Sequence, residues 1–253
     1  MLHPSKFLFW GLSGYFKLLW PKHIQRCIFG IYTINMCFSA TASFGSGAVL
    51  AVIGVVTLKI TRNPSHLVFA FIPVLFAFQQ ISEGFVWLSL QNNEYAKWQT
   101  IPIHIFMVFA HIVWPFWITL SAWLLEKQGV RKKILFVLFA MAILLSGSEV
   151  YFMLQTPITA EISEDHVKYV FEYPPLYVIV TDIVYGLVTI VPCFVCSVKK
   201  MWLLGVCFTA SLLFSAWFYQ THLLSVWCFF AAILSIIIYL IIDNHQKSGE
   251  LAI

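Results

Sequence analysis

"HLVFAFIPVLFAFQQISEGFVWLSL", residues 66–90, is the stretch that decides the fold. A membrane-spanning helix needs about 20 mostly apolar residues, and this stretch supplies them. Within it, however, stand two amides and one carboxylate, at Gln79, Gln80 and Glu83. Ionisable and strongly polar side chains at bilayer depth are costly, and they commonly mark a functional site. The stretch therefore predicts a membrane helix and raises the question of what its polar groups contact.

The composition of the whole chain agrees with a membrane protein. Of its 253 residues, 60% are hydrophobic, 17% are aromatic and only 10% are charged. Such values are typical of a polytopic membrane protein and not of a soluble domain. The net charge of +4 lies mostly in short loops, where it bears on membrane orientation and not on nucleic acid, so the bilayer is the expected partner. The oligomeric state stays open.

The same length criterion predicts an all-α bundle of seven membrane-spanning helices. A tight helical hairpin is expected at residues 219–222, between the last two spans. The one long loop is expected at residues 155–175, and it carries four acidic residues. The seven predicted spans are Phe38 to Ile60, His66 to Leu90, Ile101 to Leu125, Lys133 to Leu154, Tyr173 to Ser197, Met201 to Tyr219 and Thr221 to Ile242.

Lysine and arginine predict the orientation of the bundle, because cytoplasmic loops retain positive charge. The loops after the first, third and fifth spans and the C-terminal tail contain Lys59, Arg62, Lys127, Arg131, Lys132, Lys133, Lys199, Lys200 and Lys247. The opposite loops contain only Lys97 and Lys168. We therefore expect the first span to start outside the cell and the C-terminus to be cytoplasmic. This pattern suits a multi-pass protein of a bacterial inner (plasma) membrane.

The first 35 residues do not fit this arrangement. Their four basic residues would have to cross the membrane, and the apolar segment near residue 10 is too short to span it. Lys17 also interrupts any signal peptide. The simplest interpretation is that translation begins at Met36, so that residues 1–35 are an extension and residues 36–253 form the transmembrane domain.

Four segments carry a resemblance to a known family. They are "MCFSATASF" at residues 36–44, "FAFQQISEGFVWL" at 76–88, "WPFW" at 114–117 and "SVWCFFAAILS" at 225–235. From Met36 to about Ile242 the chain resembles an uncharacterised family of small polytopic membrane proteins. The resemblance implies a multi-helix membrane fold and a start at Met36. It implies no activity.

Polar residues of several spans fall at similar depths, in the half of the bilayer predicted to face outward. Those expected to line a ligand or proton pocket are Gln79, Gln80, Glu83, Glu149, Asp182 and Tyr185. Three histidines, His104, His111 and His222, are candidate metal ligands together with Glu83 or Asp182. Acid and imidazole together can hold zinc or another divalent cation, share protons or bind a cationic ligand. We therefore expect an outward-facing acid and histidine pocket that binds a small ligand or ion.

Two further functions stay open at this stage. The first is a metal-dependent hydrolase that acts on a lipid-like substrate, although no single helix offers a paired metal-ligand motif. The second is a proton-coupled transporter, although no inverted repeat is evident. Convergence of two histidines and an acid favours the enzyme, whereas a continuous polar path to the cytoplasmic side favours transport. Whether the protein is an enzyme is therefore undecided by the sequence.

Several of these residues also have a purely structural interpretation. Glu83 with Gln79 and Gln80 can form hydrogen bonds that join helices. Glu149 follows small residues that let helices approach closely, so it can also be a packing-site acid. The pair Cys193 and Cys196 lies in an apolar span, where thiols usually behave as small hydrophobic groups, so we expect packing there and not redox chemistry.

Overall fold

The computed structural model describes residues 39–127, 129–163, 166–218 and 230–250. It is mostly helical, and five of the predicted spans are helices long and apolar enough to cross a membrane. These are α3 (Ala40–Ile60), α4 with α5 (Pro64–Ala70 and Ile72–Gln91), α6 to α7 (Thr100–Leu125), α8 (Val130–Gln155) and α9 (Pro175–Val195). Two more helices, α10 (Met201–Phe218) and α12 (Ala231–Glu250), contain shorter apolar stretches. The tight hairpin predicted at residues 219–222 lies outside the described residues.

Two of the spans are interrupted helices, which the length criterion did not predict. Phe71 separates α4 from α5, and Pro73 has no amide hydrogen with which to continue the hydrogen-bond series there. The third span consists of α6 (Thr100–Val108), the π-helical segment η3 (Phe109–Val113) and α7 (Trp114–Leu125). A short 3-10 turn, η2 (Ala96–Trp98), precedes it. Prolines and π-segments are the usual causes of such breaks.

Helices α3 and α5 approach closely because small residues line their contact. A Cβ atom added to Gly54 would lie 2.5 Å from Val74 Cγ2, and one added to Gly47 would lie 2.9 Å from Ile81 Cγ1. These two glycines are seven residues apart, and thus on one face of α3. Close backbone approach through small residues is a common basis of helix association in membranes, where no water is available to drive it.

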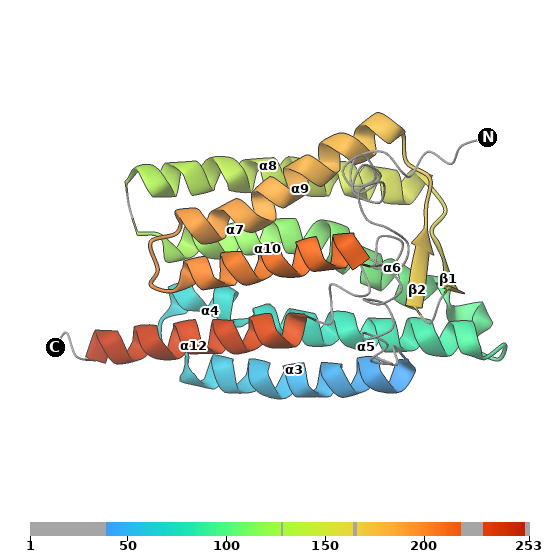
Figure 1. Ribbon diagram of the computed structural model, residues 1–253, viewed down its shortest axis with the longest axis horizontal. Coiled ribbons are helices and arrows are strands. Elements are labelled where there is room, and N and C mark those ends of the chain that lie inside the picture. Colours follow the sequence, from blue (N-terminus) through green and yellow to red (C-terminus); the bar gives the residue numbers. More distant parts are fainter. Residues whose placement is uncertain (1–38, 128, 164–165, 219–229, 251–253) are drawn as a thin grey trace, which may run out of the picture.

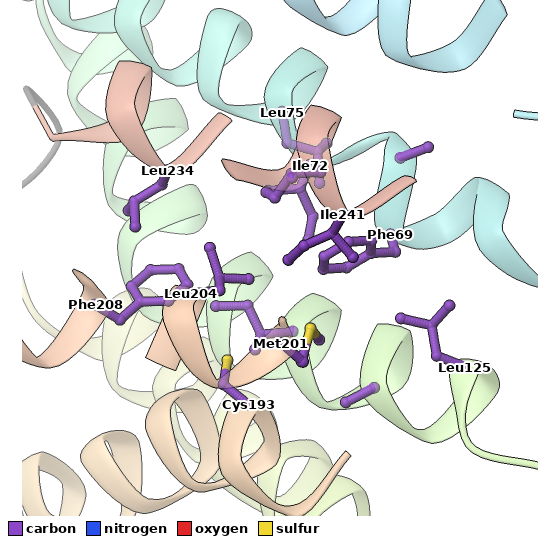
Figure 2. Close-up of a cluster of buried hydrophobic side chains, with 14 of the residues drawn as sticks. Phe69, Ile72, Leu75, Leu125, Cys193, Met201, Leu204, Phe208, Leu234 and Ile241 are labelled. Carbon is purple, nitrogen blue, oxygen red and sulfur yellow. The ribbon is translucent and has the colours of Figure 1, made fainter. Parts of the chain in front are cut away.

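The main apolar core joins the second span to helices that come much later in the chain (Figure 2). Phe69 and Ile72, at the break between α4 and α5, are each 1% exposed. Side chains from several other helices pack around this core, among them Leu125, Cys193, Met201, Leu204, Phe208, Leu234 and Ile241. Because Cys193 is a fully buried free thiol in this core, the packing interpretation of that residue agrees with its environment.

The long loop predicted between α8 and α9 instead contains a β-hairpin, so the all-α prediction is incomplete. Strand β1 (Thr159–Ser163) pairs in antiparallel register with β2 (His166–Val170), with Glu161 opposite Lys168. The Lys168 ammonium lies 2.6 Å from the Glu161 carboxylate. The hairpin is anchored on α6, because Tyr169 stacks on Phe106 with ring centroids 4.6 Å apart. Polar and apolar residues alternate along most of both short strands, and together with these contacts they form an ordered cap in the segment that was predicted to be a loop.

The two ends of the bundle differ in charge. Figure 1 shows the C-terminal end of α12 and the α7–α8 and α9–α10 connections at one end, and the β-hairpin at the other. The first end carries basic residues, among them Lys127, Arg131, Lys199, Lys200 and Lys247. The hairpin end carries Glu161 and Glu172 together with Lys168. By the positive-inside argument, the hairpin end is the one expected outside.

Candidate functional site

The predicted pocket residues do not form one cluster but two, on different sides of the third span. The first group lies between α3, α5 and α7, and the second lies between η3, α8 and α9. The third span, α6–η3–α7, contributes to both groups, with Trp114 in the first and His111 in the second.

The first group links α5 to its neighbours through side-chain hydrogen bonds. Ser46 Oγ of α3 donates to Gln80 Oε1 at 2.9 Å, and Gln80 Nε2 donates to Glu83 Oε2 at 3.4 Å. On the other side, Trp114 Nε1 donates to Gln79 Oε1 at 2.6 Å. Glu83 is only 2% exposed. For Gln79 and Gln80, these contacts agree with the predicted role in joining helices.

The second group is built around a buried carboxylate on α8. Glu149 is 3% exposed, and its Oε2 lies 3.3 Å from His111 Nδ1. Its Oε1 accepts a hydrogen bond from Tyr177 Oη of α9 at 2.9 Å. The same phenol lies 2.9 Å from Ser148 Oγ, so it bridges two neighbouring residues of α8. His111, Glu149, Tyr177 and Ser148 are called the His–Glu site below.

His111 stands in the middle of the π-helical segment. The Trp114 amide donates to the Phe109 carbonyl, five residues back, instead of to Ala110. The Ala110 carbonyl, which this leaves without its usual partner, accepts from Tyr185 Oη at 2.8 Å. Pro115 has no amide hydrogen for the carbonyl of His111 four residues back. Such π-segments occur frequently at functional sites, and here the segment presents an imidazole to a carboxylate.

The β-hairpin and the residues after it cover this site. Phe171 packs edge-on against the His111 ring, with centroids 5.6 Å apart. Tyr173 contacts Phe171 at 4.9 Å and Tyr177 at 5.7 Å between ring centroids. Tyr173 precedes the apolar span Pro175–Val195, and burial, together with the nearby Glu149 carboxylate, raises the pKa of its phenol above the ordinary range. Aromatic rings from the segment that follows the hairpin thus flank the His–Glu site.

Asp182 joins the second group by electrostatics and not by direct contact. It lies five residues after Tyr177 on α9 and interacts electrostatically with both His111 and Glu149. Its side chain is exposed on the surface of the chain. Two carboxylates near one imidazole favour a positively charged occupant, of which the smallest is a proton.

The candidate metal ligands are not brought together in the part of the chain that the structure describes. His104 Nδ1 contacts the Thr100 carbonyl of its own helix at 2.7 Å, and His222 lies outside the described residues. No three His, Cys, Asp or Glu side chains among the described residues are placed to hold a metal ion. The zinc hypothesis stays a prediction, since it depended on His222 as well.

The sequence analysis missed several residues of these sites. The hydroxyls of Tyr177 and Ser46 and the indole of Trp114 contact predicted site residues, and the Ser148 hydroxyl contacts Tyr177. Hydroxyl and aromatic residues are common in membrane helices, so they carry little signal of their own. The one pattern that points to Tyr177 is a regular spacing along α9.

Hydroxyl and thiol residues follow one another at four-residue intervals through α9 and just beyond its end. The row consists of Tyr177, Thr181, Tyr185, Thr189, Cys193 and Ser197. One end of the row meets Glu149. At the other end, Ser197 Oγ donates at 2.8 Å to Oε1 of Glu126, a carboxylate that is 5% exposed at the end of α7. The row therefore extends from one buried carboxylate to another.

Comparison with known proteins gives the family of the chain. No curated protein and no solved structure matches it. A family of unknown function, DUF6629, matches residues 36–252 and leaves out the first 35 residues, as the resemblance in sequence had suggested. The chain belongs to this family.

Proposed function

We propose that this chain is an integral membrane protein whose His–Glu site binds and releases a proton in response to the pH on the side of the β-hairpin. The observation that carries the proposal is the distance of 3.3 Å between His111 Nδ1 and Glu149 Oε2, within an aromatic enclosure. Histidine is the side chain whose ordinary titration range lies nearest physiological pH. A buried carboxylate beside it gives the protonated imidazole a partner.

Further details support a proton more than a metal ion. His111 Nδ1 faces the Glu149 carboxylate, which can exchange a proton with it, whereas the buried Nε2 finds no hydrogen-bond partner among the described residues. Each Glu149 oxygen is approached from a different helix, by Tyr177 and by His111, so the carboxylate is held in place for proton exchange. A catalytic zinc site needs three protein ligands, whereas His111 and Glu149 supply two here. From the positive-inside argument we expect this site to lie toward the outer face.

Proton-coupled transport is the second candidate, and the row of hydroxyls on α9 favours it. From Tyr177 to Ser197 the chain advances 20 residues, which at 1.5 Å per residue is about 30 Å, the thickness of the hydrocarbon layer. Successive members rise by about 6 Å, so water would have to lie between them for a proton to pass. Thr181 and Thr189 donate to carbonyls four residues back, which is also a common structural role of threonine in helices.

Nuclear magnetic resonance of histidine side chains tests the primary proposal. Protein labelled with ¹⁵N-histidine in lipid nanodiscs is titrated between pH 4 and pH 9, and the His111 signal is identified by its loss in His111→Asn. We expect this signal to report protonation in that range and its midpoint to move in Glu149→Gln. His104, whose ring contacts the Thr100 carbonyl instead, is the internal control and keeps its midpoint. A His111 ring that keeps one protonation state throughout would overturn the proposal.

Transport is tested separately in liposomes that contain a pH-sensitive dye. With a membrane potential applied, we expect the reconstituted chain to admit protons and Glu149→Gln to abolish this flux. A wild-type flux no greater than that of empty liposomes excludes proton transport but leaves proton binding at the site intact. The two candidates are therefore distinguishable.

A further inference from the structure

A groove lies between α5 and α6, away from the His–Glu site. Its volume is about 610 Å³, within the range of about 300–1,000 Å³ that is usual for ligand pockets. Lining residues on both of its walls are well exposed on the surface, among them Phe78 at 57%, Phe85 at 51%, Ile101 at 55% and Ile105 at 44%. The groove is therefore a surface feature of two helices that are apolar enough to cross a membrane.

The lining of the groove is suited to a hydrocarbon. No charged side chain lines it, and apart from two serines its lining residues are aliphatic or aromatic. Its two serines are already satisfied within α5, since Ser82 Oγ donates to the Phe78 carbonyl at 3.2 Å and Ser89 Oγ to the Val86 carbonyl at 2.8 Å. A polar ligand would find few partners there, whereas an apolar chain would lose none.

One part of the groove carries the features of a membrane interface. Tyr95 and Trp98 line it where η2 joins α5 to α6, and both are exposed, at 47% and 57%. Such aromatic residues concentrate at the level of lipid headgroups. Lys97 Nζ lies 5.9 Å from the centroid of the Trp98 ring, so a positive charge stands beside this end of the groove. A phosphate is the complement of that charge at a membrane surface.

We propose that the groove holds one acyl chain of a membrane glycerophospholipid, with the lipid phosphate near Lys97. The apolar lining binds the chain, the aromatic residues contact the glycerol region, and the ammonium group of Lys97 binds the phosphate. This inference does not depend on proton binding at His111. The groove nevertheless reaches Phe109, the first residue of the π-helical segment.

Native mass spectrometry of protein purified in mild detergent tests the proposal. We expect the wild-type chain to retain one phospholipid after extensive washing. Ile105→Trp, which fills the groove, should reduce the retained fraction roughly tenfold, the effect of excluding about two methylene groups from it. Ile143→Trp is the matched control, because Ile143 is 47% exposed on α8 and lies outside the groove. Lys97→Gln should lower retention of phospholipid but not of a fatty alcohol.

A photoreactive phospholipid with a diazirine in its acyl chain identifies the occupant directly. We expect cross-links at Phe85 and Ile105, well above those at Val137, which is 57% exposed on another helix. Three outcomes overturn the proposal: equal labelling of all three residues, equal retention in Ile105→Trp and Ile143→Trp, or cross-links from the groove to a protein segment. The last outcome would assign the groove to residues 1–38 of the chain or to a second copy.

Discussion

The contact between His111 and Glu149 makes a prediction that can be worked through quantitatively. Glu149→Gln keeps the size of the side chain and an oxygen that can accept from Tyr177, but it removes the charge beside His111. Removing one partner of a buried ion pair commonly costs about 3–5 kcal/mol of unfolding free energy. The His111 side chain is 19% exposed, so we expect the lower end of that range, about 3 kcal/mol.

A double-mutant cycle separates this contact from the other effects of each substitution. We expect His111→Asn to cost about as much as Glu149→Gln, because each substitution leaves the other member of the pair without its partner. If the two residues interact, the protein with both substitutions is less destabilised than the sum, by about 2 kcal/mol. The unfolding free energy is measured at pH 6 by reversible unfolding of the reconstituted protein in mixed detergent micelles.

The control cycle pairs His104→Asn with Glu149→Gln. His104 contacts a backbone carbonyl of its own helix, so these two substitutions should add to within about 0.5 kcal/mol. If the His111 cycle also adds to within about 0.5 kcal/mol, the two side chains are not energetically coupled. The proposal that they share a proton would then lose its basis.

Three more substitutions test other parts of the structure by the same unfolding measurement. Gly54→Ala should cost about 1–3 kcal/mol because its Cβ would meet Val74, whereas Gly45→Ala, with open space around it, should be neutral or stabilising; equal effects would contradict the close approach of α3 and α5. Trp114→Phe should cost about 1–3 kcal/mol, because the buried Gln79 loses its hydrogen bond from the indole. Adding Gln79→Leu should restore most of this loss. Folding raises the pKa of Tyr173, so the contribution of this residue to the unfolding free energy is fully present below the ordinary tyrosine pKa of about 10. The contribution is lost as the pH rises above that value. Tyr173→Phe should make that fall shallower, and an unchanged pH profile would exclude Tyr173 as a contributor.

The lengths of apolar stretches were sufficient to predict the helical spans. The five long spans begin and end within a few residues of the predicted positions, because a minimum number of apolar residues is required to cross a bilayer. The interruptions at Phe71 and at residues 109–113 were not predicted, since they depend on local hydrogen bonds and not on composition. The β-hairpin was also missed, because two strands of five residues give a much weaker signal than a span.

For the candidate site, the position of each polar residue along its helix could be predicted, but the neighbouring helix that its side chain faces could not. Position along a helix follows from counting residues, so Glu83, His111 and Glu149 were correctly identified as polar residues within spans. Which neighbour each side chain faces depends on how the helices pack, and a single sequence does not specify this. For that reason the glutamines of α5 and the His–Glu pair appeared as one pocket, although they lie on different sides of the third span.

The π-helical segment also fixes the relative register of α6 and α7. A π-turn contains about one more residue than an α-turn, so the segment amounts to a one-residue insertion in an otherwise continuous helix. Deletion of a single residue from 109–113 would let the helix continue as α, and everything on its N-terminal side would turn by about 100° relative to α7. His104, Ile105 and the exposed side of α6 would then point to different neighbours. One residue of chain length thus determines which face of α6 meets the hairpin and which face is exposed.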